Sequence, residues 1–236
     1  MGWEVIDTGV ASAARNMELD AALLASLPTR KDPIVHFYDW EGLCATHGYF
    51  VKPEDFLNRE SVALHNVQLA RRPTGGGIVF HIWDFAFSVL IPSSCPLFSK
   101  NTLENYALVN NAVLRAVKQF LKGNYVLTPS DSISMDSSCK SFCMARPTKY
   151  DVMLGDRKVA GAAQRQKSYG FLHQGTISLM KPSKLLNALL LPRTLVWEAM
   201  QAYTAHLLDV DATENELKEV RCEMRLLLEQ SLTKDT

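Results

Sequence analysis

Residues 71–81 are the stretch of this chain with the clearest potential for chemistry, and they read Arg-Arg-Pro-Thr-Gly-Gly-Gly-Ile-Val-Phe-His. Glycine lets a backbone approach a ligand without a Cβ and tolerates positive φ. Successive N–H groups in such a loop can converge on an anion, and Arg71 and Arg72 add planar donors for a phosphate or carboxylate. A tight turn that enters a strand is the simpler interpretation. The flanking arginines and His81 favour a binding loop as the alternative.

Residues 155–175 form a second distinctive stretch, which reads Gly-Asp-Arg-Lys-Val-Ala-Gly-Ala-Ala-Gln-Arg-Gln-Lys-Ser-Tyr-Gly-Phe-Leu-His-Gln-Gly. Lys158 stands where a hairpin strand starts, and small residues that include Gly161 and Ala163 follow it. Small residues let a ligand lie against the backbone, where a lysine at the strand edge can reach a carbonyl or phosphate oxygen. A solvated strand lysine is the alternative, because most lysines are exposed.

Together the two stretches resemble the lipoate–protein ligase and octanoyltransferase family. Residues 71–81, 155–165 and 172–177 carry the resemblance, and 7–20 is similar to the family's opening strand and helix. The resemblance covers residues 3–190. It implies an α/β (α+β) fold with a central mixed β-sheet flanked by helices, related to biotin–protein ligase catalytic domains. It also implies that a lipoyl or octanoyl group is attached by an amide bond to one lysine of a lipoyl domain.

The resemblance further implies which residues form the site. Lys158 matches the family's catalytic lysine, Arg72 and His81 match positions that line the pocket, and His173 resembles the first histidine of a His-His-Gly-Thr run. A hydrogen-bonded sheet histidine is the alternative for His173. The expected substrate-binding residues are Arg71, Arg72, Gly75, Gly76, Gly77, His81, Gly161, Ala163, His173 and Gly175.

The source of the acyl group divides the family into branches, and the sequence has features of both. One branch takes the group from an acyl-carrier-protein thioester through a cysteine, and Cys143 fits its Cys-x-x-x-Pro-x-x-Tyr pattern. A thiolate accepts and releases an acyl group readily, so Cys143 is the second expected catalytic residue, with Cys139 as an alternative of poorer spacing. The other branch uses ATP and magnesium to form an acyl-adenylate, and Gly77 is typical of it. We favour thioester transfer narrowly.

A non-catalytic binder of lipoyl domains is a third interpretation, because Ile82 replaces the family's usual aspartate. Lys158 and the glycine loop favour an enzyme. The expected partners are the lipoyl domains of 2-oxoacid dehydrogenases or the glycine cleavage H protein, and an acyl carrier protein if the donor is a thioester. Lipoate or octanoate would be a substrate, and no permanently bound cofactor is expected.

Apolar periodicity and turn residues predict the elements that must position these side chains. Strands are expected at 3–7, 34–38, 45–50, 67–71, 78–81, 85–91, 150–154, 157–160 and 171–180. Helices are expected at 12–26, 99–122, 185–191, 194–208 and 214–228. Residues 128–149 lack periodicity and are predicted to form a long loop. We expect a catalytic domain over residues 3–190 and a helical extension over 191–236 that packs on it.

Composition limits the function classes. The 25 basic and 25 acidic residues give no net charge, which argues against a nucleic-acid binder with a broad basic surface. No run of eighteen apolar residues and no signal-peptide pattern is present, so we expect no membrane span and no secretion. Five cysteines are an odd number and favour a reducing, cytoplasmic setting. Cys139 and Cys143 lack a second such pair, so no metal site is expected.

Overall fold

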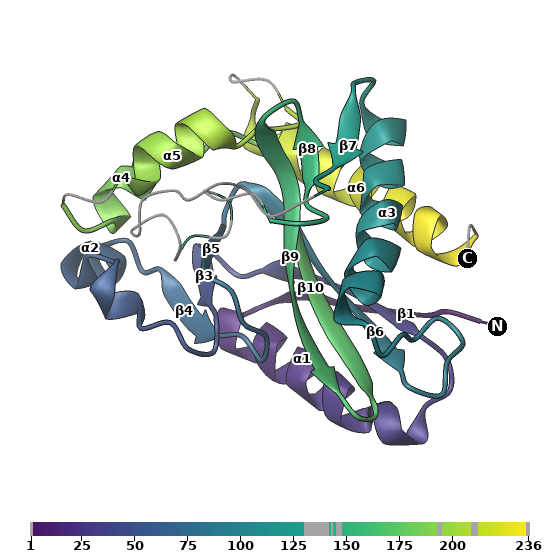
Figure 1. Ribbon diagram of the computed structural model, residues 1–236. Coiled ribbons are helices and arrows are strands. Elements are labelled where there is room, and N and C mark those ends of the chain that lie inside the picture. The colour runs from purple at the N-terminus through teal and green to yellow at the C-terminus, as the bar shows by residue number, and fades with distance from the viewer. Residues whose placement is uncertain are drawn as a thin grey trace.

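A seven-stranded sheet runs through the centre of the computed structural model, which describes residues 2–129, 142, 144, 148–192, 195–208 and 212–234 (Figure 1). In spatial order its strands are β1 (Glu4–Ala11), β2 (Ile34–Trp40), β6 (Asp84–Pro92), β10 (Gly170–Ser178), β9 (Arg157–Lys167), β8 (Val152–Leu154) and β7 (Tyr125–Leu127). Strands β1 and β2 are parallel, and the other neighbours are antiparallel. The sheet is therefore mixed.

A smaller three-stranded sheet carries the glycine loop. Its order is β4 (Gln68–Arg71), β3 (Cys44–His47) and β5 (Ile78–His81). Strands β4 and β5 both pair with β3, and residues 72–77 connect them. The loop therefore leaves and re-enters one small sheet, which fixes both of its ends.

Helices cover both faces of the central sheet (Figure 1). The described helices are α1 (Ala13–Ser26), α2 (Arg59–Leu64), α3 (Thr102–Phe120), α4 (Leu185–Leu189), α5 (Val196–Tyr203) and α6 (Glu214–Thr233), with 3-10 turns at Leu27–Thr29 and Pro53–Asp55. Ser12 caps α1 by accepting from the Arg15 N–H, and Thr213 and Glu216 form a capping box at α6. Such caps satisfy N–H groups that a helix start leaves without partners.

The two faces of the sheet pack against different helices. Alternate residues of a strand point to opposite faces. One set, which includes Phe37, Phe87 and Phe171, joins α3 and α6 in the largest apolar cluster. The other set packs against α1 and the small sheet, as Tyr38 and Leu172 do. The candidate site lies on this second face.

The expected fold class is confirmed, and several predicted elements differ in extent. The strand expected at 45–50 ends at His47, because the chain turns at Gly48, where a Cβ would collide with the Gly76 carbonyl. Strand β9 continues to Lys167, and the short β7 lies just beyond the helix predicted to end at 122. The division at residue 190 stays a prediction, although α6 packs on α3. In the described part of the chain, no helix is long and apolar enough to cross a membrane.

Candidate active site

The buried Arg72 side chain holds the glycine loop in place through hydrogen bonds. Its guanidinium donates to the carbonyls of Gly75 and Gly77 at 3.0 and 2.8 Å, and to the Thr46 carbonyl and hydroxyl at 3.2 and 2.8 Å. The side chain is buried. A buried arginine needs such partners, because an unpaired charge inside a protein is costly. These four bonds make Arg72 an organiser of the loop.

Backbone conformation and close contacts explain the glycine at position 76 of the loop. Gly76 has φ +85°, a region that residues with a side chain rarely adopt. A Cβ there would lie 3.2 Å from the Arg72 guanidinium and 3.5 Å from the Ala163 Cβ. Gly48, directly after β3, donates its N–H to the Gly77 carbonyl at 3.2 Å. The loop is therefore pressed against β9 at Ala163.

Lys158 is a buried cation with a buried counter-ion. Its Nζ lies 2.7 Å from Oδ2 of Asp151, and the two side chains are 1% and 2% exposed. The Thr148 N–H and hydroxyl donate to the same carboxylate oxygen at 2.6 and 3.0 Å. The Lys158 side chain runs over Gly161, where an added Cβ would collide with its Cε and Nζ. Gly161 thus makes room for the amine.

A β-bulge in β9 places the Lys158 side chain on the same face of the sheet as Gly161. In the β8–β9 pair, Val152 faces Ala160 but the next residue, Met153, faces Lys158. The extra residue, Val159, shifts the alternation of side chains. Without it, Lys158 would share the face of Ala160, which packs into the apolar core. With the bulge, Lys158 meets Gly161.

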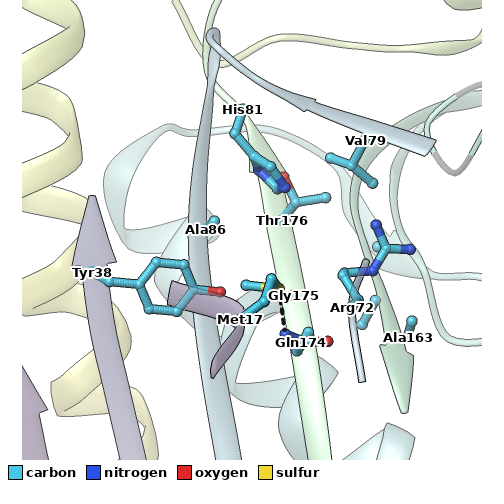
Figure 2. A pocket seen from close by; sticks show the side chains of 12 residues that line it. Met17, Tyr38, Arg72, Val79, His81, Ala86, Ala163, Gln174, Gly175 and Thr176 are labelled. Carbon is cyan, nitrogen blue, oxygen red and sulfur yellow. Dashed lines mark hydrogen bonds between the residues drawn. The ribbon is translucent and has the colours of Figure 1, made fainter. Parts of the chain in front are cut away.

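A narrow cavity lies beside these two features: Arg72, which organises the loop, and Gly161, over which the Lys158 side chain runs, both line it. Figure 2 shows Arg72 at one end of this cavity. Its volume is about 20 Å³, which is room for roughly one water molecule, so an acyl chain must push side chains aside to enter. It is lined by Met17, Tyr38, Arg72, Val79, His81, Ala86, Gly161, Ala162, Ala163, Gln174, Gly175 and Thr176. Gly161 and Ala163 face it two residues apart, about 7 Å along β9. The glycine loop and the Lys158 amine therefore converge.

His81 forms part of a buried polar chain on one wall. Its Nε2 and Nδ1 lie 2.8 Å from the Thr46 hydroxyl and from Oδ2 of Asp84. Thr176 donates to the same Asp84 oxygen at 2.5 Å, and the Trp40 ring stacks on the imidazole with 4.0 Å between centroids. The imidazole plane is thus held against this wall of the cavity.

Two of the expected binding residues, Arg71 and His173, have side chains that point away from the cavity. Arg71 is exposed, with its guanidinium 4.6 Å from the centre of the Tyr49 ring. His173 faces α3, near Phe87 and Tyr106, and burial lowers its pKa to about 3. Since adjacent strand residues face opposite sides, its neighbour Gln174 lines the cavity instead. The structure brings neither Arg71 nor His173 into the cavity.

Cys143 and Cys139 lie outside the described residues, but the chain neighbours of Cys143 are placed. Phe142 pairs with Ile78 in a β-bridge, and the Met144 carbonyl accepts from the Thr204 hydroxyl at 3.0 Å. Thr204 also bridges to Lys158 along the main chain. Residues 142 and 144 are therefore tied to the end of the glycine loop and to the lysine strand.

Sequence reasoning missed several residues of the site. They are Met17, Tyr38, Thr46, Asp84, Asp151, Gln174 and Thr176. Polar residues at alternate positions of a buried strand were an available signal for Gln174 and Thr176, because a polar face inside a protein needs partners. Asp151 lies in the first strand of the predicted hairpin whose second strand contains Lys158, and this proximity in the sequence was a signal for the ion pair.

The fold and the cavity define a class of site, one that binds an acyl group. A narrow cavity lined by Gly161, which lies directly against a buried ammonium group, suits a molecule with a hydrocarbon tail and a reactive carboxyl group. The apolar walls favour the tail, and the ammonium can stabilise negative charge that develops on the carboxyl oxygen.

Comparison with known proteins agrees with this class. The model of the lipoyl protein ligase A/B catalytic domain family matches residues 12–204. Octanoyltransferase LipM of Bacillus subtilis (strain 168) is 32% identical over 204 residues, which are 84% of this chain and 73% of that protein. LipM of Geobacillus kaustophilus (strain HTA426) is 32% identical over 191 residues, 79% and 69% of the two chains. The chain belongs to the lipoyl protein ligase A/B catalytic domain family.

Solved structures confirm the fold. Lipoate-protein ligase A bound with ATP superposes with a TM-score of 0.71 at 22% identity, over 98% of this chain and 86% of that chain. A bi-partite lipoate protein ligase of Thermoplasma acidophilum gives a TM-score of 0.71 at 20% identity, over 98% and 84%. The resemblance seen in the sequence is therefore confirmed for family and fold.

Proposed function

We propose that this protein transfers an octanoyl group from an acyl-carrier-protein thioester to the lysine of a lipoyl domain. The glycine loop and the buried Lys158 amine lie against β9 at Ala163 and Gly161, which line one narrow cavity, and this arrangement supports the proposal most directly. The similarity to proteins named octanoyltransferase LipM favours octanoate and a thioester donor over free lipoate with ATP and magnesium. The acceptors would be lipoyl domains of 2-oxoacid dehydrogenases or the glycine cleavage H protein.

Cys143 would carry the acyl group between donor and acceptor. Its thiolate attacks the thioester carbonyl, an Sγ–carbon bond forms, and the carrier sulfur leaves and takes up a proton. The acceptor lysine amine then attacks the acyl-cysteine, the amide bond forms, and the displaced thiolate recovers a proton from the amine. A reducing cytoplasm would keep the thiol free for each cycle.

Lys158 would hold the reacting carbonyl in both steps. Negative charge develops on the carbonyl oxygen as each nucleophile adds, and a preformed ammonium in a dry site stabilises this charge strongly. Asp151 keeps the ammonium in place through the 2.7 Å ion pair. The cavity beyond would take the tail, because each buried methylene contributes about 0.8 kcal/mol.

The test compares the two donors with purified components. The protein is incubated with a lipoyl domain and either octanoyl acyl carrier protein or free lipoate, ATP and magnesium. We expect a mass increase of one octanoyl group on the acceptor with the first donor only. Robust product from lipoate and ATP alone would establish the ligase reaction instead, and no product from either donor would favour a non-catalytic binder.

Cysteine variants test the intermediate in the same assay. Cys143→Ser should stop turnover, and an octanoyl adduct on wild-type Cys143 should appear when the acceptor is omitted. Cys222→Ser is the matched control, because Cys222 is exposed on α6 and should leave transfer unchanged. Full activity of Cys143→Ser with loss in Cys139→Ser would move the role to Cys139.

A further inference from the structure

A second cavity, open at the surface beside the start of β9, is polar and basic. Its volume is about 270 Å³, which leaves room for several water molecules or for one larger anion. Arg157, Lys181, Gln201 and His206 contribute most of its polar lining, and no carboxylate of the described residues lines it. This chemistry differs from that of the narrow acyl pocket and suits a negatively charged ligand.

Main-chain hydrogen bonds fix the walls of this basic cavity. The Ala205 N–H donates to the Lys158 carbonyl at 2.9 Å, and the Leu207 N–H donates to the Ser178 carbonyl at 3.2 Å. The segment 204–208 therefore ties the start of β9 to the end of β10. Because the cavity lies among these tied segments, its shape exists before any ligand arrives.

The two cations of the cavity act at one place. Arg157 and Lys181 are exposed, and in the described part of the chain no carboxylate forms an ion pair with either. The His206 ring is held by a hydrogen bond of 2.7 Å between its Nδ1 and the Ser178 hydroxyl. Burial, Lys181 and Arg157 together lower the pKa of His206 to about 4. Both positive charges are therefore felt at the same imidazole.

Gln201 adds a donor that needs an acceptor. Its side-chain nitrogen is buried and has no hydrogen-bond partner among the residues that the structure describes. A buried donor without an acceptor is costly, so a ligand oxygen in the cavity would remove that cost. A phosphate group has several such oxygens, and arginine is well suited to bind two of them at once. The donor set thus matches a phosphate ester.

Thr204 links the basic cavity to the active site. It lines the cavity, and its hydroxyl donates to the Met144 carbonyl at 3.0 Å. Its main chain forms a β-bridge with Lys158. Met144 directly follows Cys143 in the sequence. A ligand held in the basic cavity therefore lies beside the segments that carry both expected catalytic residues.

The separation of the two sites suits a long, flexible donor. Gly161, which lies against the Lys158 amine, is four residues from Arg157 on β9, or about 13 Å along the strand. The phosphopantetheine arm of an acyl carrier protein has a phosphodiester at one end and the thioester sulfur at the other. The arm is comparable to between four and five extended amino-acid residues, roughly 15 Å, so it can reach from one site to the other.

We propose that Arg157, Lys181 and the Gln201 amide bind the phosphodiester of the phosphopantetheine arm that carries the acyl group. The inference rests on the proposed thioester-transfer function and adds the site that recognises the donor. The acyl pocket would then bind one end of the donor and the basic cavity the other. The acceptor lysine carries no phosphate, so the basic cavity would serve only the first half of the reaction.

The experiment compares two small donors that differ only in the phosphate, octanoyl-phosphopantetheine and octanoyl-pantetheine. Arg157→Gln and Lys181→Gln should each raise KM about 10-fold for the first donor, the loss expected for one charge-assisted hydrogen bond. Neither variant should change KM for the second donor, or kcat for either. Lys184→Gln is the matched control, because Lys184 is exposed close to Lys181 in the chain and does not line the cavity.

Three outcomes would overturn the proposal. An equal rise in KM for both small donors would show that the two cations only support the local structure. An unchanged KM for both would show that the cations do not contact the donor. A change seen only with octanoyl acyl carrier protein would mean that the cavity faces an acidic surface of the carrier and not the phosphate of its arm.

A binding measurement separates failure of this proposal from failure of the proposed function. Phosphopantetheine without an acyl group is added to the wild-type protein, and the pKa of His206 is followed by NMR. A bound anion offsets the charges of Lys181 and Arg157, so this pKa should rise, whereas pantetheine should leave it unchanged. A rise without any octanoyl transfer would mean that the proposed function falls and the phosphate site stands. An equal rise with the same concentration of inorganic phosphate would overturn the assignment to the arm.

Discussion

The two faces of the central sheet contain different kinds of side chain. The face toward α3 and α6 contains the largest apolar cluster, with Phe37, Phe85, Phe87 and Phe171 packed against the helix residues. The face toward α1 contains a buried carboxylate at Asp20 and a second polar chain through His81. One face therefore supplies hydrophobic stabilisation, and the other places polar groups that are costly to bury.

This difference shows where the molecule can tolerate change. An apolar core tolerates substitutions that conserve volume, whereas a buried hydrogen-bond network loses much of its stabilisation when one member is removed. Substitutions on the α3 face should mainly alter stability. Substitutions on the α1 face should alter activity beyond their effect on stability. The following predictions test that contrast.

The largest effect is expected at Lys158. Lys158→Met removes the ammonium group and should lower octanoyl transfer by about 1,000-fold, the loss typical of removing one preorganised oxyanion donor. It should also lower the free energy of unfolding by ~3–5 kcal/mol, because Asp151 is left buried without its counter-ion. Transfer assays and urea unfolding measure the two effects. Lys118→Met, at an exposed position of α3, is the control.

The double variant Lys158→Met, Asp151→Asn separates the two effects. Removing the second charge should restore most of the lost stability, because no unpaired buried charge remains. It should not restore transfer. Wild-type rates in the single variant would show that Lys158 is only a structural partner of Asp151.

A smaller effect is expected from adding a single Cβ to each face. In Gly161→Ala the new atom would collide with the Lys158 amine, and a displacement of about 1 Å typically lowers a rate about 100-fold. The Gly175 backbone lines the cavity, but in Gly175→Ala the new Cβ would point to the α3 face and collide with the Phe87 ring, which should cost about 1–3 kcal/mol of stability through overpacking. Rates and unfolding free energies are measured for both. Equal losses of activity and equal losses of stability would contradict the contrast between the faces.

Most elements, and both ends of the site, could be predicted from the sequence. Ser12 was expected to cap a helix that ends near residue 26, and the hairpin at Gly155-Asp156 precedes Lys158 as expected. Periodicity and turn residues determine such local features. The glycine loop and Lys158 do converge, which the resemblance implied and the spacing alone did not.

The direction of individual side chains could not be predicted. Arg71 and Arg72 are consecutive, so a strand leading into the loop must send them to opposite sides, and only the small sheet decides that Arg72 is the buried one. The same ambiguity applies to His173 and Gln174 on β10, because the sequence alone does not show which of the two side chains faces the cavity. Lys158 depends on a bulge at Val159, which reverses the alternation and leaves no recognisable mark in the sequence.

Near neutral pH the smallest effect is a pH dependence of stability from the α3 face. The pKa of His173 is lowered to about 3 by burial, against 6.5 for an unperturbed histidine. Between these values the unfolded chain binds a proton that the folded chain does not, so folding loses stability as the pH falls from 6.5 toward 3, by up to about 1.4 kcal/mol per pH unit. Below pH 3 both states are protonated and the loss stops growing.

His173→Phe tests this contribution without introducing a new polar group. Its Nε2 has no hydrogen-bond partner in the described part of the chain, and the ring packs near Phe87 and Tyr106, so an aromatic replacement suits the site. Urea unfolding at several pH values should show a shallower decline for the variant than for wild type. His206→Phe is a useful comparison, because burial, Lys181 and Arg157 lower the His206 pKa only to about 4, so its contribution should stop growing at higher pH. A slope in His173→Phe identical to wild type would mean that His173 becomes protonated within the folded protein, and that this face is more accessible to water than its packing indicates.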